Sequence, residues 1–460
     1  MRVAIVGGGI AGLAAARRLE ALRVDAEVVL LEREPTPGGK IVTERAGGFV
    51  IEGGPDSFLS RKERGPGLCE ELGLGNELVG RRPGNARSYV RYRGELHPLP
   101  AGLTGMIPTN LDALAEGTLL SPEGRERLAA EVDLPAAPDE GDESIASFVS
   151  RRLGPEAYEL LVEPLLTGIY AGDGELLSLQ ATFPGLRALE LEHGSLIRGL
   201  LAQPVPPTGG LPPFVGLRTG MDALVTALVA GLERTVLRAR TSASAIVRRT
   251  GGYRVLVDGG EAVEVDGVVV AVPAFAAAEL LAGLDETLSS AHAGIPYASS
   301  ALVSLGYRLE DVPHPLDGYG YVVPRAEGSD VTACTWTSSK WEGRAPEGSA
   351  LIRVYAGRYG RRDVTAEPDE ALIALAREEV RLLGITAEPS LSVVHRWPLS
   401  MPQYVLGHPD RLDAIEGALE GHPGLAVAGA AYRGVGIPDC IRSGEEAAAA
   451  VTRALAPVAG

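Results

Sequence analysis

The sequence is poor in the residues that build disulfide scaffolds, thiolate metal sites and nucleic-acid surfaces. Its 460 residues include only three cysteines, Cys69, Cys334 and Cys440, and their wide spacing fits neither a disulfide framework nor a zinc site. Lysine and arginine number 43 against 60 aspartates and glutamates, which gives a net charge of −17. Because a phosphate backbone needs a basic partner surface, we expect no nucleic acid among the partners.

A long hydrophobic run is also missing. The longest stretch almost free of charge, residues 267–278, contains Pro273, whereas a membrane-spanning helix needs about 20 apolar residues. Residues 99–120 are broken by proline and glycine, so we expect no stable membrane insertion. The chain runs from Met1 directly into strand-like residues without a signal-peptide pattern. We therefore expect a cytoplasmic protein.

The strongest pattern with chemical meaning lies in the first 32 residues. The apolar run 2–6 predicts a buried strand, and a G-x-G-x-x-G pattern follows it at the start of a helix predicted over residues 13–22. Such glycines make a tight turn, let the backbone approach a pyrophosphate and let the helix pack closely on the strand. Glu32 ends the next predicted strand, 27–31, where a carboxylate accepts hydrogen bonds from a ribose diol. The arrangement predicts dinucleotide binding at a helix N-terminus.

Two further glycine turns favour FAD over NAD. Gly38-Gly39-Lys40 follow Glu32 closely, so the backbone can approach a long ligand and Lys40 can reach phosphate or ribityl oxygens. Near the other end, the strand-like run 425–430 leads into a glycine-rich turn and a helix that is predicted to reach about Leu455. The start of that helix can face the flavin N1–C2=O edge, where negative charge gathers on reduction. We therefore predict a flavin domain assembled from both ends of the chain.

The predicted fold class is α/β, with a discontinuous Rossmann-like FAD-binding domain, an α+β substrate domain and a helical insertion. Helical periodicity covers residues 145–166 and 176–201, and strand-like stretches between 295 and 405 surround one predicted helix, 368–383. The residues 203–213 are rich in proline and glycine and are predicted to be a linker. The expected boundaries are 1–65, 206–294 and 411–460 for the FAD-binding domain, 66–99 and 295–410 for the substrate domain, and 100–205 for the insertion.

Five segments resemble the porphyrinogen oxidase family of the flavin amine-oxidase superfamily, and most closely its Gram-positive coproporphyrinogen III oxidase branch. They are residues 53–59 with 61–62, residues 163–173, residues 332–337, residues 396–397 with 400–404, and residues 434–441. The resemblance extends from Met1 to about Leu455. It implies non-covalent FAD, molecular oxygen as the electron acceptor, and a six-electron oxidation of coproporphyrinogen III to coproporphyrin III that releases hydrogen peroxide.

The resemblance also implies site residues. Lys62 matches a family lysine tied to activity on coproporphyrinogen, and a backbone contact to FAD is implied near Ala243, where the family often has valine. The other implied FAD contacts are Gly7, Gly8, Gly9, Ile10, Ala11, Gly12, Glu32, Arg33, Lys40, Gly54, Pro55, Asp56, Ser57, Trp397, Gly434, Val435, Gly436 and Ile437.

The chemistry of the substrate adds further expectations. A hydride leaves a bridging carbon of the porphyrinogen for flavin N5, so neither a side-chain nucleophile nor a metal is required, and the seven histidines are dispersed. The four propionates call for cations, for which Lys62 and the arginines between residues 61 and 93 are candidates; a solvated basic face remains the alternative for those arginines. An apolar slot must hold the macrocycle, and its candidate residues, each with core packing as the alternative, are Leu166, Ile169, Tyr170 and Trp336.

Other functions compete with this one. Protoporphyrinogen IX has two propionates and needs fewer cations. An amine oxidase commonly needs an aromatic cage, whereas aromatic residues make up only 5% of this chain. A carotenoid desaturase and a non-catalytic flavin or porphyrin carrier are the remaining alternatives. If the product is a porphyrin, a transient handover to a ferrochelatase is the expected protein partnership.

Overall fold

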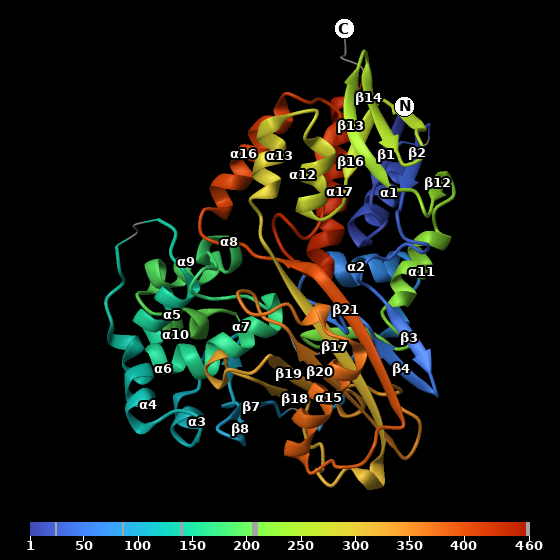
Figure 1. Cartoon of the computed structure of the whole chain (residues 1–460). Helices are drawn as coiled ribbons and strands as arrows, with labels where there is room; N and C mark the ends of the chain where they lie inside the picture. Colours follow the sequence, from blue (N-terminus) through green and yellow to red (C-terminus); the bar gives the residue numbers. More distant parts are fainter. Residues whose placement is uncertain (24, 85–86, 139–140, 205–209, 457–460) are drawn as a thin grey trace.

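The computed structural model describes residues 1–23, 25–84, 87–138, 141–204 and 210–456. Both chain ends lie in the same lobe, and a long β-sheet and a group of helices form the rest of the molecule (Figure 1). Part of the predicted linker 203–213 and the last four residues of the predicted third FAD segment lie outside the described residues.

A five-stranded parallel sheet organises the lobe that holds both ends. Its order is β12-β2-β1-β16-β22. Because both faces are covered, its strands are continuous apolar runs, with Val3 and Ile5 in one core and Ala4 and Val6 in the other. The strands are β1 (Arg2–Val6), β2 (Glu27–Leu31), β12 (Thr235–Arg238), β16 (Gly267–Val270) and β22 (Leu425–Val427).

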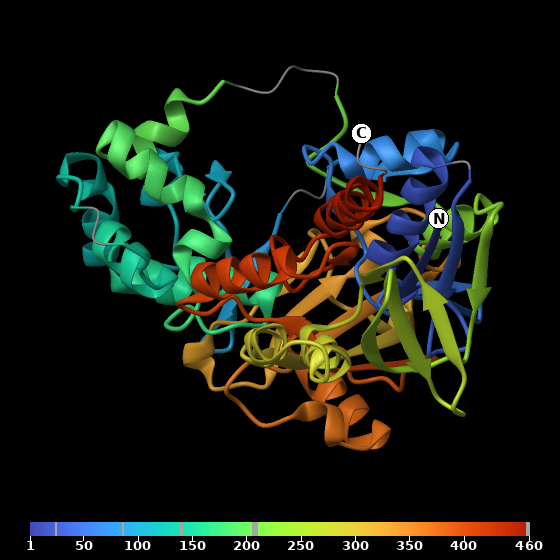
Figure 2. The ribbon, with the colours of Figure 1, turned by 90° about the horizontal axis from the view of Figure 1, so that it is seen from above.

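Helices from opposite ends of the chain cover one face of this sheet. Seen from above, α1 (Ile10–Leu22) and α17 (Ile437–Ala454) lie side by side (Figure 2). The same core takes in α2 (Arg64–Glu71) and α11 (Asp222–Ala230). The other face is covered by α12 (Ala274–Leu281), α13 (Glu286–Ala293), α16 (His408–Glu420) and the antiparallel strands β13 (Ala243–Arg249), β14 (Gly252–Val257) and β15 (Ala262–Val265).

A second, seven-stranded sheet has the order β21-β17-β20-β19-β18-β7-β8. One of its faces packs on α15 (Asp369–Val380) around a separate core. Two long strands run from this sheet toward the lobe with the chain ends (Figure 1). The strands are β7 (Tyr89–Tyr92), β8 (Glu95–Pro98), β17 (Tyr297–Arg308), β18 (Gly320–Val322), β19 (Val331–Trp336), β20 (Ser349–Ala356) and β21 (Leu391–Pro402).

The residues between 111 and 202 form helices around a core of their own. A π-helical segment, Tyr158–Val162, joins α6 to α7. The helices are α3 (Leu111–Ala115), α4 (Pro122–Ala129), α5 (Ile145–Leu153), α6 (Pro155–Ala157), α7 (Glu163–Tyr170), α8 (Leu179–Thr182), α9 (Pro184–His193) and α10 (Leu196–Ala202).

Short elements fill the junctions between these parts. The helix α14 (Thr337–Lys340) follows β19. Three small antiparallel sheets are formed by β3 (Thr43–Ala46) with β4 (Phe49–Glu52), by β11 (Phe214–Leu217) between β5 (Phe58–Leu59) and β6 (Leu78–Gly80), and by β9 (Leu103–Thr104) with β10 (Ile107–Pro108).

The predicted α/β class and its parallel sheet are confirmed. The predicted strands 2–6 and 27–31 coincide with β1 and β2. The predicted helix 145–166 is divided, because Gly154 has a φ of +97° and Pro155 starts a new helix. The predicted helix 176–201 is divided in the same way at Pro184 and at Gly194, whose φ is +71°.

Candidate functional site

The turn between β1 and α1 admits only glycine at two positions. Gly7 has a φ of +105°, and a Cβ on Gly12 would lie 1.9 Å from the Gly7 carbonyl oxygen. In contrast, nothing lies within 4 Å of the position that a Cβ on Gly9 would occupy. Gly9 is also the N-cap of α1, and no side chain caps it. The turn therefore presents the unpaired N–H groups of a helix start to open space, as a phosphate site requires.

Glu32 is fixed at the carboxyl end of β2. Its side chain is buried, and its two oxygens accept hydrogen bonds from the Gly8 N–H at 2.6 Å and the Glu34 N–H at 2.8 Å. The structure thus brings the carboxylate and the first turn together. The entrance to β13 is close as well, because the Thr241 N–H donates to the Glu32 carbonyl at 2.8 Å, two residues before Ala243. Arg33 is exposed and pairs with Glu34 at 3.2 Å.

The second glycine turn lies against the first. The Gly38 N–H donates to the Gly8 carbonyl at 2.8 Å, and Gly38 also forms an isolated parallel bridge with Gly9. Lys40 follows, and burial lowers the pKa of its ammonium although the neighbouring Cys440 acts in the opposite direction. Since Cys440 belongs to α17, Lys40 extends from the second turn toward the C-terminal helix.

The loop 53–57 is held from both sides. A Cβ on Gly54 would lie 1.9 Å from the Lys40 carbonyl oxygen, and the Gly53 carbonyl accepts a 2.6 Å hydrogen bond from the indole N–H of Trp397 on β21. The side chain of Ser57 donates to Asp56 at 2.8 Å. The predicted contacts Gly54, Asp56, Ser57 and Trp397 are therefore neighbours, together with Pro55 in the same loop.

Asp56 is surrounded by donors from β20 and from the end of α14. Lys340 lies 2.8 Å away, Arg353 3.3 Å, and the Trp341 indole N–H donates at 3.1 Å. Burial alone would raise the pKa of Asp56, but Lys340 and Arg353 outweigh it and hold the pKa of this carboxyl well below its usual range. The carboxylate therefore anchors the loop to the sheet, and its charge is fully engaged within the protein.

The third turn, 434–437, is fixed by one tyrosine. The Tyr404 hydroxyl accepts from the Gly434 N–H at 2.9 Å and donates to the Ala430 carbonyl at 2.6 Å. Gly436 is the N-cap of α17 and has no side-chain cap, so this turn too leaves helix-start N–H groups available. Val435 and Ile437 complete the turn.

One face of the second sheet is turned toward these loops. Cross-strand partners share a face, and Arg353 and Tyr355 of β20 are paired with Thr335 and Ala333 of β19. Arg353 donates to the Gly54 carbonyl at 3.1 Å and to the Glu52 carbonyl at 2.7 Å, so this face contacts the loop 53–57. Thr335, Ala333 and Tyr355 are only half-buried.

The four residues predicted to form an apolar slot do not lie together. Leu166 and Tyr170 are buried in the core of the helical region, whereas Ile169 is 40% exposed on the same helix. Trp336 belongs to the opposite face of β19 and packs behind the sheet, where it has no exposed surface. The prediction for Trp336 therefore needs correction: alternation along β19 turns this ring into the core next to α15.

Lys62 is engaged by a protein carboxylate. Its ammonium lies 2.5 Å from Asp439 of α17. Part of the predicted basic cluster is engaged in the same way, because Arg64 pairs with Glu445, Arg87 with Asp317 and Arg91 with Glu379. Three of the seven arginines between residues 61 and 93 are therefore partners of protein carboxylates.

Sequence reasoning assigned no role to three of the residues that hold the turns, Tyr404, Asp439 and Arg353. A signal existed only for Arg353, which is a charged residue inside the apolar strand 349–356. The other two act through contacts with distant segments, which residue spacing does not reveal.

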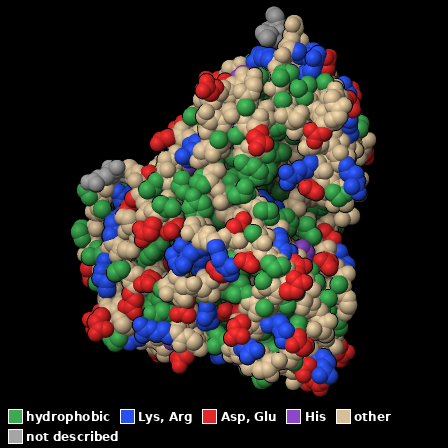
Figure 3. Space-filling view, viewed as in Figure 1, with side chains coloured by type: hydrophobic (Ala, Val, Ile, Leu, Met, Phe, Trp, Pro, Cys, Tyr) green, Lys and Arg blue, Asp and Glu red, His purple; other side chains and the backbone are tan. Residues whose placement is uncertain are grey.

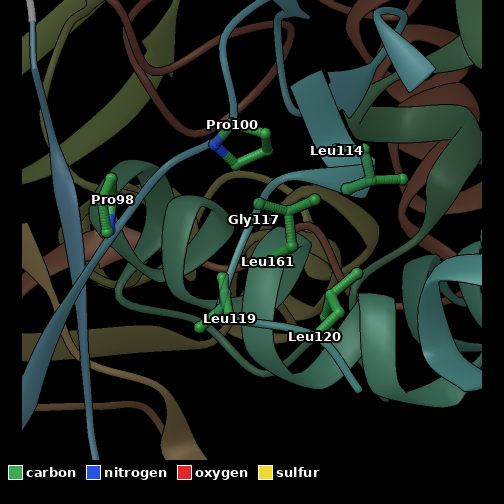
Figure 4. Close-up of a pocket in the computed structure, with 7 residues that line it drawn as sticks. All are labelled: Pro98, Pro100, Leu114, Gly117, Leu119, Leu120 and Leu161. Carbon is green, nitrogen blue, oxygen red and sulfur yellow. The ribbon is translucent and has the colours of Figure 1, made fainter. Parts of the chain in front are cut away.

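A small, partly open pocket of about 10 Å³ lies elsewhere, in the helical region (Figure 4). It is lined by apolar groups, among them Leu114, Leu120 and Leu161. This volume holds about one water molecule, so the pocket is too small for a flavin or a macrocycle.

The described residues lack two features. No group of three His, Cys, Asp or Glu side chains there is placed to hold a metal ion. No helix there combines the length and the apolar character needed to cross a bilayer.

A comparison with known protein families identifies the class of protein. The family described as flavin containing amine oxidoreductase matches residues 10–452. The chain belongs to this family.

Among the relatives are coproporphyrinogen III oxidases. The protein from Bacillus subtilis (strain 168) is 38% identical over 97% of this chain and 96% of its own length, and the one from Staphylococcus aureus is 34% identical over 97% and 98%. Protoporphyrinogen oxidase 1 from the chloroplast of Spinacia oleracea is 32% identical over 97% of this chain and 83% of its own length.

Solved structures are similar as well. A provisionally designated protoporphyrinogen oxidase from Exiguobacterium sp. 255-15 superimposes with a TM-score of 0.88 at 35% identity over 98% of both chains. Reduced UDP-galactopyranose mutase reaches a TM-score of 0.73 at 17% identity over 100% of this chain and 96% of its own, which shows a shared fold alone.

Proposed function

We propose that this protein oxidises coproporphyrinogen III to coproporphyrin III, with FAD as its cofactor and molecular oxygen as the electron acceptor. The observation that carries the proposal is the presence of three glycine turns from both chain ends, two of them at helix starts without a side-chain cap, in a chain 38% identical over nearly its full length to a coproporphyrinogen III oxidase.

Each of the three turns suits a different part of the cofactor. The first turn and the start of α1 suit the pyrophosphate, and the buried Glu32 suits the adenosine ribose. The turn 38–40 and the loop 53–57 suit the ribityl chain and the isoalloxazine ring, with Trp397 bonded to the loop. The turn 434–437 suits the N1–C2=O edge, because a helix start stabilises negative charge there. Ala243 suits a backbone contact to the adenine end, next to Glu32.

A bound FAD would supply the hydride acceptor for a bridging carbon of the porphyrinogen and the means to reduce oxygen to hydrogen peroxide. The residues of this chain orient the macrocycle. The half-buried side chains of Thr335, Ala333 and Tyr355 offer a wall, and Ile169 on α7 offers exposed apolar surface. Hydrophobic side chains also gather where the lobes meet (Figure 3). Burying the macrocycle against such surface excludes water from the reacting carbon.

Protoporphyrinogen IX is the second candidate substrate, because relatives named protoporphyrinogen oxidases match nearly the whole chain. The two substrates differ in the number of propionates, four against two. They therefore differ in how strongly cations contribute to binding.

The test is a direct comparison of the two substrates in air. Purified protein is expected to carry a bound flavin that its absorption spectrum identifies and that denaturation releases as FAD. Coproporphyrinogen III is expected to give fluorescent porphyrin with a higher kcat/KM than protoporphyrinogen IX, above the rate of spontaneous oxidation without enzyme. Absence of flavin, or no porphyrin above that rate, would refute the proposal, and a preference for protoporphyrinogen would select the second candidate.

A further inference from the structure

The carboxylate of Asp439 is buried against the third glycine turn. It is the third residue of α17 and only 5% exposed. A Cβ on Gly434, whose φ is +137°, would lie 2.5 Å from the Asp439 carboxyl carbon. The carboxylate is therefore in contact with the turn itself.

Two cations from different segments face this carboxylate. The Lys62 ammonium lies 2.5 Å from one oxygen although Lys62 is 377 residues away along the chain, and Arg442 on the next turn of α17 lies 3.4 Å from the other oxygen. Lys62 is the closer, and its side chain is 40% exposed, whereas that of Arg442 is 52% exposed. The nearest compensating charge thus comes from outside the helix.

The charges near the third turn also act on the pKa values of Tyr170 and Cys440. Burial, and then the charge of Asp439, raise the pKa of the Tyr170 hydroxyl. Burial raises the pKa of the Cys440 thiol to about 12, although Lys40 and Lys62 act in the opposite direction. The turn 434–437, Tyr170 of α7 and Lys62 are therefore neighbours of Asp439, and Lys40 is a neighbour of the adjacent Cys440.

A buried carboxylate at this place opposes any further negative charge on the neighbouring turn. The N–H groups at the start of α17 attract such a charge, so their effect depends on how completely Asp439 is neutralised. Lys62 supplies that neutralisation at hydrogen-bond distance.

We propose that Lys62 is a positioning residue that neutralises Asp439, and that this ion pair sets how readily the turn 434–437 accepts the charge that a flavin gains on reduction. The assignment rests on the proposed function, because it requires a flavin bound with its N1–C2=O edge at this turn. It differs from a role for Lys62 as a partner of substrate propionates, because that role changes substrate binding and leaves the flavin potential measured without substrate unchanged.

The midpoint potential of the bound flavin tests the assignment without substrate. It is measured by equilibration with a redox dye on FAD-loaded wild type, Lys62→Met, Asp439→Asn and the double variant. Lys62→Met is expected to weaken the binding of reduced relative to oxidised FAD about tenfold, which is a fall of about 30 mV for a two-electron couple. Asp439→Asn is expected to raise the potential, the double variant to return close to wild type, and Lys62→Arg to remain close to it.

Arg61→Met is the matched control, because it removes an exposed cation next to Lys62. Its potential is expected to equal that of wild type. Equal potentials in wild type and Lys62→Met, with a raised KM for coproporphyrinogen, would overturn the assignment in favour of propionate binding. If Lys62→Met does not fold, an unchanged potential in Asp439→Asn overturns it. A wild-type protein without flavin would instead refute the proposed function.

Discussion

The indole N–H of Trp397 donates a 2.6 Å hydrogen bond to the carbonyl of Gly53, 344 residues earlier in the chain. One long strand of the second sheet thereby holds the backbone of the loop that follows β4. Trp397→Phe keeps an aromatic side chain, although a smaller one, and removes the donor. We expect a loss of about 1 kcal/mol in the free energy of unfolding, and weaker FAD binding measured by fluorescence titration.

Tyr253→Phe is a matched control for that change. The Tyr253 hydroxyl donates to the Pro423 carbonyl at 2.9 Å, in the layer of β14 and away from the three turns. It is expected to lose a similar free energy of unfolding with no change in FAD affinity. Equal FAD affinity in Trp397→Phe and wild type would show that the loop 53–57 does not depend on this bond.

Because α1 and α17 approach closely, one methyl group added between them is predicted to destabilise the protein strongly. A Cβ on Gly444 would lie 2.0 Å from the Ala11 carbonyl oxygen, so the two helices must separate to admit it. We expect Gly444→Ala to destabilise the protein by about 2 kcal/mol or more, measured by thermal unfolding. Gly417→Ala on α16 has nothing within 4 Å and is expected to be neutral or slightly stabilising; similar melting temperatures for the two variants would contradict the packing.

The lowered pKa of the buried Glu190 carboxyl predicts that the protein loses stability in acid. Its side chain has no exposed surface, and hydrogen bonds from Arg151 and other donors overcome the effect of burial and lower the pKa of Glu190 to about 2. Because the pKa in the folded state lies below that of an unfolded glutamate, the stabilisation is complete above about pH 4.5 and is lost as pH falls toward 2.

Glu190→Gln is therefore expected to lower the free energy of unfolding at pH 7 by on the order of 2 kcal/mol, and to remove part of the decline between pH 4.5 and 2. Urea titrations at a series of pH values measure both. Glu192→Gln, on the same helix and 75% exposed, is the control and should follow wild type. An unchanged pH profile in Glu190→Gln would place the acid-sensitive group elsewhere.

Ile169 tests the apolar surface offered to the macrocycle. It is 40% exposed on α7, so a charge there can be solvated without unfolding the helix. Ile169→Glu is expected to lower kcat/KM for coproporphyrinogen about tenfold or more, because it places a carboxylate near an apolar ring, while the flavin spectrum stays unchanged. Leu309→Glu, at a position 53% exposed, is expected to retain full activity, and equal activities in the two variants would remove α7 from the substrate site.

The first turn was predictable because its signals are local. β1, Gly7, Gly12 and Glu32 fall within 32 residues, and each residue type has one conformational or chemical reason to be there. The face of β19 was not predictable, because both sides of the second sheet carry apolar residues and alternation alone does not say which side Trp336 takes. The ion pair of Lys62 with Asp439 could not be predicted from the sequence for another reason, since only the tertiary fold brings these positions together.

The packing of α17 on α1 sets an order of events during protein synthesis. The strand β22 and the helix α17 are made more than 400 residues after β1, yet they complete the layer that the first residues begin. A nascent chain that lacks them leaves one side of α1 uncovered, and the proposed flavin site is complete only after α17 has been made. A protein cut short before Leu425 is expected to accumulate as an unloaded, degradation-prone species.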